Sequence, residues 1–293
     1  MELHATPEHE GQRLDAVLAG PLGSRARAQR LIDGGHVLVD GAAVPKRHRL
    51  RAGERITVDE PPEAPRVQGA DAPYAVPYED DDLLVVDKPA GVVVHPARGH
   101  QTGTLAQALE GVASGGEDAA RAGIVHRLDR DTSGLLVVAK HEVAHRRLKA
   151  ALQAREITRE YLTLVEGRPP ARTGTIDAPL GRDRRIRTRI STETDDPRSA
   201  VTHFVLEEAL ASTSLLRVTL QTGRTHQIRA HLLAIGHPVA GDPEYGTAGL
   251  LGLERQFLHA ARLAFTQPMT GAPIDVSSPL PSDLQAALEA AGG

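Results

Sequence analysis

The apolar residues of this chain fall into short runs and alternations, which predict a protein built from both helices and strands. Near the N-terminus, apolar residues have helical spacing in segments 13–20 and 24–35. Strand patterns follow in segments 36–44 and 54–59. Ser24 is a suitable N-cap for the second helix, and Asp40-Gly41 is a hairpin turn sequence. These elements predict a small α/β domain over residues 1–60.

Residues 61–77 contain five prolines and no hydrophobic periodicity, which predicts a linker. From residue 78 to the C-terminus, strand patterns alternate with a few helical ones. The strand patterns are 82–96 (read as a strand pair), 135–139, 157–167, 200–210 and 214–222, and the helical ones are 104–112, 142–155 and 225–236. This order favours an α+β domain over residues 78–293, with a mixed or antiparallel sheet.

The composition narrows the function classes. The chain has no cysteine, so disulfides and thiolate chemistry are excluded, and no apolar run approaches the roughly 20 residues of a membrane span. The N-terminus lacks the apolar core of a signal peptide, so we expect a cytoplasmic protein without a membrane segment. The net charge of −4 argues weakly against a nucleic-acid partner.

The charge is unevenly distributed along the chain. Residues 21–55 hold eight Lys or Arg against three acidic residues, and residues 181–189 hold five Arg against one Asp. Such patches are either solvated faces or contacts for nucleic-acid phosphates, and the pattern alone leaves both interpretations open.

The segment GIVHRLDRDTSGLLVVAK (123–140) places Asp129 between two arginines, just before a buried strand. The cluster is either a structural ion-pair network or a reactive site. Flanking guanidinium groups and the hydroxyls of Thr132 and Ser133 favour an ionised Asp129, which suits a nucleophile or a base. The chain has no HExxH, GxxxxGK[ST] or GxSxG motif, so metal, nucleotide and serine-nucleophile sites lack their usual signatures.

Two further segments contain candidate residues. The predicted helix 225–236, with Thr225 as its N-cap, places His226 and Arg229 on one face and turns Ile228, Leu232 and Ile235 toward a core. Tyr161 lies in the alternating strand 157–167, where ordinary strand packing is the simpler interpretation.

Several segments of the sequence resemble those of a known family. HRLDRDTSGL (126–135) matches all seven fixed positions of the HRLDxxTSG motif of the RluA/RluD family of RNA pseudouridine synthases. Residues 83–96, 159–167 and 222–246 resemble three further elements of that family, in the same order. Residues 12–60 are similar to the RNA-binding domain named after ribosomal protein S four. Glu244 departs from the resemblance, because a basic residue is common there.

The resemblance implies a pseudouridine synthase fold with a mixed, largely antiparallel central sheet, preceded by the small RNA-binding domain. It implies a cofactor-free and metal-free monomer whose partner is RNA, most closely like the branch that modifies large-subunit ribosomal RNA. The implied catalytic residues are Asp129 as the catalytic aspartate, Tyr161 as the aromatic partner of the target base, and Arg229 as the cation that pairs with Asp129. The residues expected to bind the substrate nucleotide are His126, Arg127, Thr132, Arg224, His226 and Gln227. Those expected to contact RNA more widely are Arg25, Arg27, Arg30, Lys46, Arg47, Arg49, Arg184 and Arg185.

In the implied reaction, uracil leaves its ribose, turns and is rejoined through a ring carbon. Asp129 would attack the anomeric carbon or abstract the neighbouring ribose proton, and the sequence does not choose between the two. Two other functions compete: an N-glycoside hydrolase that uses Asp129 and Asp131 as paired carboxylates, and a non-catalytic RNA-binding or ribosome-assembly factor. The target uridines, and whether free RNA or an assembling subunit is modified, stay open.

Overall fold

The computed structural model describes residues 1–22, 25–59, 72–96, 101–116, 118, 121 and 123–292. The elements of the N-terminal part are β1 (Glu2–His4), η1 (Pro7–His9), α1 (Leu14–Val17), α2 (Arg25–Asp33), β2 (Val37–Val39), β3 (Ala42–Ala43) and β4 (Arg55–Val58). Those of the remaining chain are β5 (Ala75–Glu79), β6 (Leu83–Lys88), α3 (Leu105–Ala108), β7 (Ser133–Ala139), α4 (Glu142–Gln153), β8 (Thr158–Glu166), β9 (Thr173–Asp177), β10 (Gly181–Arg182), β11 (Ile190–Ser191), β12 (Val201–Ala209), β13 (Thr213–Leu220), α5 (Gln227–Ala234), η3 (Leu250–Gly252), β14 (Leu258–Thr266), β15 (Pro273–Ser277) and α6 (Ser282–Gly292).

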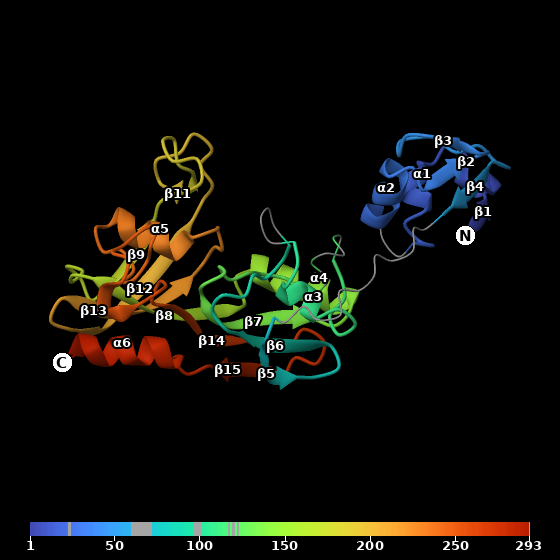
Figure 1. The fold of residues 1–293 in the computed structure, drawn as a ribbon. Helices are drawn as coiled ribbons and strands as arrows, with labels where there is room; N and C mark the ends of the chain where they lie inside the picture. Colours follow the sequence, from blue (N-terminus) through green and yellow to red (C-terminus); the bar gives the residue numbers. More distant parts are fainter. Residues whose placement is uncertain are drawn as a thin grey trace.

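The first four strands form an antiparallel sheet of their own, in the order β1-β4-β2-β3 (Figure 1). Asp40 and Gly41 both have positive φ, as a tight hairpin between β2 and β3 requires. One face of the sheet packs on α1 and α2 through a separate apolar core that includes Leu14, Ile32 and Ile56. The predicted small α/β domain is therefore confirmed, and β1 is a strand that the hydrophobic pattern did not reveal.

The larger sheet has nine strands, with eight of them in the order β5-β6-β7-β14-β8-β13-β12-β9 and β15 paired to β14 (Figure 1). All its strand pairs are antiparallel except β7 with β14, where Ser133 and Gly134 lie opposite His259 and Ala260. The prediction of a mixed, largely antiparallel central sheet is confirmed. Strand β14 comes late in the sequence yet lies between β7 and β8.

Strands β6 and β7 are buried on both faces, which explains their unbroken apolar runs. Leu84, Val86 and other alternate side chains face a core that also contains residues of α3 and α6. Leu83 and Val85 face the opposite core, which α4 covers. Because both faces are apolar, these strands show no alternation of polar and apolar residues.

The predicted strand pair over residues 82–96 is wrong in its second half. Strand β6 pairs with β5 and β7, whereas Val93 and Val94 leave the sheet and accept hydrogen bonds from Leu105 N and Ala106 N at the start of α3. The chain turns away because Pro89 has no N–H to donate and because Lys88 Nζ binds the carbonyls that flank the turn, at Pro89 and Val92.

The predicted linker 61–77 lies outside the described residues up to residue 71. Its last three residues, 75–77, belong to β5, where Pro77 is tolerated because β5 is an edge strand. The boundaries of the two predicted domains stay a prediction. Among the described helices, none is long and apolar enough to cross a bilayer.

Candidate active site

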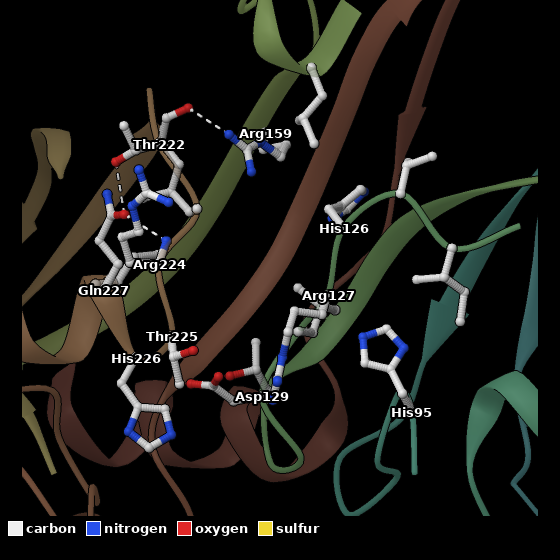
Figure 2. Close-up of a pocket in the computed structure, with 18 of the residues that line it drawn as sticks. His95, His126, Arg127, Asp129, Arg159, Thr222, Arg224, Thr225, His226 and Gln227 are labelled. Carbon is white, nitrogen blue, oxygen red and sulfur yellow. Dashed lines mark hydrogen bonds between the residues drawn. The ribbon is translucent and has the colours of Figure 1, made fainter. Parts of the chain in front are cut away.

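A pocket of about 510 Å³ opens beside the central sheet, between the loop that precedes β7, the start of β8 and the segment from the end of β13 into α5 (Figure 2). All nine residues that the sequence analysis assigned to catalysis or to the substrate nucleotide line it. They are Asp129, Tyr161, Arg229, His126, Arg127, Thr132, Arg224, His226 and Gln227. The structure thus brings together side chains that lie up to 103 residues apart in the sequence.

Arg229 lies at the end of the pocket where Asp129 is found, and it is surrounded by carboxylates. Its Nη1 donates to Asp129 Oδ2 at 3.4 Å, while Nε and Nη2 hold Asp242 at 2.6 and 2.9 Å. Nη2 also donates to Glu244 at 3.3 Å. Burial opposes the charge of Arg229, but the hydrogen bonds and negative charge of Asp242 outweigh it and raise the pKa of the guanidinium. Arg229 is a permanent cation aimed at Asp129.

The arginines that flank Asp129 in sequence do not pair with it. Arg130 turns to Asp131, with Nε and Nη2 within 3.1 Å of its carboxylate, and Arg127 is exposed at the pocket. The charge partner of Asp129 is therefore Arg229, from a distant segment, and not a sequence neighbour.

Tyr161 is on β8, opposite Val218 of β13 and Ala260 of β14. Its side chain is 5% exposed, and that exposure is to the pocket. Burial raises the pKa of the phenol above 10, with the negative charge of Asp129 adding to the rise and the positive charge of Arg159 opposing it. The hydroxyl is therefore protonated at neutral pH.

Helix α5 starts one residue later than predicted, and its N-cap is His226 with φ of 52°, not Thr225. Gln227, the first residue of the helix, binds back to the preceding loop and to β12: its Oε1 accepts from Arg224 N and Thr222 Oγ, and its Nε2 donates to Val201 O and Thr202 Oγ. With its amide fully used inside the protein, we expect Gln227 to position the loop instead of binding the nucleotide directly. Ile235, predicted to face the core, is 37% exposed.

Tyr245 connects this site to the arginine-rich hairpin, defined as residues 181–191. Its ring lies between two guanidinium groups, with the Cζ atoms of Arg189 and Arg229 at 4.4 and 4.7 Å from the centroid. Its hydroxyl accepts from Ile190 N and lies 3.0 Å from His226 Nδ1. One aromatic side chain therefore joins the hairpin to both His226 and Arg229.

Of the eight residues predicted to contact RNA more widely, the five whose side chains the structure describes do not line the pocket. Arg184 of the arginine-rich hairpin pairs with Asp195, which follows the hairpin, and Arg185 is exposed. Lys46 pairs with Asp33. Arg49 donates to Gly11 O and Arg47 is exposed. The side chains of Arg25, Arg27 and Arg30 lie outside the described part of the chain. The RNA contacts of all eight residues stay a prediction.

Sequence reasoning missed three pocket-related residues. Asp242 is 0% exposed and orients Arg229, yet a lone aspartate in a loop sequence gives no signal of that. Tyr245 was visible only as part of the resemblance. Arg159 lies on the same face of β8 as Tyr161, but its place in an alternating strand gives no further signal of a role. In the described chain, no three His, Asp or Glu side chains are placed to hold a metal ion, and the metal-free site stays a prediction.

Two family profiles match the chain. Residues 82–234 match the RNA pseudouridylate synthase family, and residues 12–56 match the S4 domain. The first match contains most of the pocket, and the second falls within the N-terminal sheet and its helices.

Similar proteins cover almost the whole chain. A relative from Bacillus subtilis, named uncharacterized RNA pseudouridine synthase YlyB, is 42% identical over 99% of this chain and 97% of its own length. Ribosomal large subunit pseudouridine synthase D of Xanthomonas campestris is 43% identical over 96% of this chain and 89% of that protein. Among solved structures, human RNA pseudouridylate synthase domain containing 1 superposes with a TM-score of 0.56 at 29% identity, covering 72% of this chain and 84% of that chain.

Proposed function

The chain belongs to the RNA pseudouridylate synthase family and isomerises uridine in RNA to pseudouridine, and we propose that its substrate is large-subunit ribosomal RNA. The proposal is supported by the near full-length similarity to a protein named for the large ribosomal subunit. The S4 match adds an RNA-binding unit ahead of the catalytic one. We also propose that it works as a monomer in the cytoplasm, where bacterial ribosomes are assembled.

The observation that carries the catalytic assignment is the 3.4 Å contact between Arg229 Nη1 and Asp129 Oδ2 at the wall of a pocket that also holds Tyr161. Asp129 acts as the nucleophile toward the anomeric carbon or as the base that removes the neighbouring ribose proton. Arg229 keeps a fixed positive charge beside it, held in orientation by Asp242. Tyr161 offers a ring face to the uracil and a protonated hydroxyl near the ring carbon that loses its proton.

Entry of the base requires the uridine to leave its stack, at a cost of a few kcal/mol. The exposed arginines at 184 and 185, together with the basic segment 21–55 of the N-terminal domain, supply the phosphate contacts that offset it. These contacts also explain how a chain with a net charge of −4 binds RNA, because the cations are concentrated locally.

The hydrolase alternative is disfavoured by the position of Asp131. A second catalytic carboxyl should be free and able to hold a proton, yet Asp131 is bound by Arg130 through both oxygens and does not line the pocket. The non-catalytic binding factor is left as the alternative to be tested directly.

The decisive experiment measures tritium release from unmodified large-subunit ribosomal RNA that carries tritium at carbon 5 of uracil. We expect release with the wild-type protein, none with Asp129→Ala at similar RNA affinity, and near wild-type release with Asp131→Asn as the matched control. Turnover by Asp129→Ala would refute the mechanism. If free RNA gives no release, the assay is repeated on precursor subunits, and tight binding without release there would establish the binding-factor alternative.

A further inference from the structure

The pocket contains an unusual concentration of buried polar atoms without a hydrogen-bond partner. Among the described residues, five buried side-chain atoms have no hydrogen-bond partner, and three of them line this one pocket: His95 Nδ1, His126 Nδ1 and Arg159 Nε. Buried polar groups in proteins are nearly always paired. The pocket is therefore lined by buried polar atoms whose partners the described protein does not supply, and one of them, Arg159 Nε, can only donate.

Arg159 is the most exceptional of the three. It is 6% exposed, and its one hydrogen bond runs from Nη2 to Leu220 O at 3.3 Å. No carboxylate in the described chain lies within ion-pair distance of it, whereas Arg229 in the same pocket has three. A buried cation without an anion is costly, so a purely structural arginine would be expected to have a partner.

His126 adds a second donor beside it. Its Nε2 accepts a hydrogen bond from Val137 N at 3.1 Å, so in the neutral ring the proton must be on Nδ1. Burial, together with the positive charge of Arg159, lowers the pKa of His126 to about 3, so the ring is neutral at neutral pH. His126 thus offers an N–H to the pocket next to the unpaired guanidinium.

We propose that Arg159 and His126 form a subsite for one backbone phosphate of the RNA, adjoining the target uridine. The ligand is an anion because a neutral carbonyl would leave the guanidinium charge uncompensated, while a phosphate both neutralises it and accepts from Nε. Figure 2 shows Arg159 and Asp129 at opposite ends of the pocket, with His126 and Arg127 between them. The subsite therefore holds the sugar-phosphate chain away from the reacting atoms.

This inference rests on the proposed function, because it requires an RNA strand in the pocket. Its test uses a short RNA that contains a mapped target uridine, in which the phosphates flanking that uridine are replaced one at a time by neutral methylphosphonates. Dissociation constants are measured at one fixed salt concentration for the wild-type protein, Arg159→Met and Arg146→Met. Arg146 is an exposed residue of α4 outside the pocket and serves as the matched control.

We expect one methylphosphonate to weaken wild-type binding on the order of tenfold to a hundredfold, the range of charge-assisted hydrogen bonds. Arg159→Met should bind the natural RNA more weakly by a similar factor, and the same methylphosphonate should weaken its binding little further. Arg146→Met should show the wild-type affinity for the natural RNA and the wild-type loss of affinity at that linkage. Equal losses for wild type and Arg159→Met at every linkage would overturn the proposal. So would wild-type affinity with a reduced turnover number, which would place Arg159 at the reacting base.

Thermal stability gives a second, independent readout. If Arg159 lacks a partner in the free protein, Arg159→Met should melt at the wild-type temperature or above it. A clearly lower melting temperature would contradict the proposal, because it would mean that the free protein already satisfies the guanidinium. Tritium release from the unsubstituted RNA tests a different claim. Its absence refutes the proposed substrate, whereas the affinity ratios and the melting temperature test whether Arg159 binds a phosphate.

Discussion

Asp242 is the residue whose replacement most directly tests how the site is held together. Its side chain is fully buried, and three donors converge on Oδ1: Arg229 Nη2, Glu244 N and Tyr245 N. Arg229 Nε donates to the other oxygen, Oδ2, at 2.6 Å. In Asp242→Asn the remaining oxygen stays with the three donors, and the new NH₂ group faces Arg229 Nε, donor against donor.

Breaking one partner of a buried ion pair costs about 3–5 kcal/mol. For a unit of roughly 200 residues, 1 kcal/mol corresponds to about 2–4 °C in melting temperature, so we expect a decrease of about 6–20 °C. The turnover number should also fall, because Arg229 loses the contacts that aim it at Asp129. The assays are thermal unfolding by circular dichroism and tritium release at 25 °C, where the variant is still folded.

The pH dependence of this effect has a definite sign. Burial pushes the pKa of Asp242 up, but hydrogen bonds and charge from Arg229, aided by two backbone N–H groups, bring it below the ordinary value of 3.8. A folded-state pKa below the unfolded one contributes stability that is complete above about pH 4 and is lost as the pH falls through the folded value. The gap in stability between wild type and Asp242→Asn should therefore be constant at neutral pH and narrow below about pH 4.

The matched control is Asp275→Asn, because Asp275 accepts from Arg262 with the same two-point geometry, at 2.8 and 2.7 Å, but on the surface. Its removal should hardly change the melting temperature, since solvent screens exposed pairs. Equal decreases for the two variants, or an Asp242→Asn protein that melts like the wild type, would refute the view that the buried carboxylate orients Arg229.

Three further predictions follow from other parts of the molecule. Tyr161→Phe keeps the ring but removes the hydroxyl, so the turnover number should fall on the order of a hundredfold or more with RNA affinity nearly unchanged; a fall in affinity alone would contradict this. Gly134→Ala should unfold at much lower temperature than Gly249→Ala, because both glycines have positive φ but only at Gly134 would a Cβ overlap the backbone of Ala260; similar melting curves would be the contrary result. Deleting residues 1–60 should weaken RNA binding and flatten its salt dependence while leaving the chemical step intact, as single-turnover rates can check.

Most of the fold could be predicted from local pattern. The runs at β6 and β7 and the alternation at β8 and β12 are strand signals that tertiary contacts did not override. The turn at Pro89 was missed because the valines after it have strand propensity, and only the three-dimensional position of the Lys88 ammonium shows why they leave the sheet. The N-cap of α5 was misplaced because the sequence gives no sign of the left-handed backbone at His226, from which the helix starts one residue later than predicted.

The site was predictable in its membership and, through the resemblance, in one pairing: Arg229 was expected to pair with Asp129, and it does. Charge proximity along the sequence gave a different expectation, that the flanking arginines act on Asp129, but Arg130 binds Asp131 instead. The sequence could not single out Arg159. Its distinguishing property is that it is buried without a carboxylate partner in the described chain, and only the three-dimensional structure shows which groups surround it. Asp242 acts only through the orientation of another side chain, which again depends on the fold.

Strand β14 is synthesised after all the residues assigned to catalysis, because it begins at Leu258. While the chain is still growing, Asp129, Tyr161 and Arg229 have all been made, but β7 and β8 lack the strand that joins them. Pairings between segments so distant in sequence form only after the whole domain can close. The pocket is therefore incomplete until β14 has been made and has paired with both strands, so the residues of the site gain their geometry only after their own synthesis.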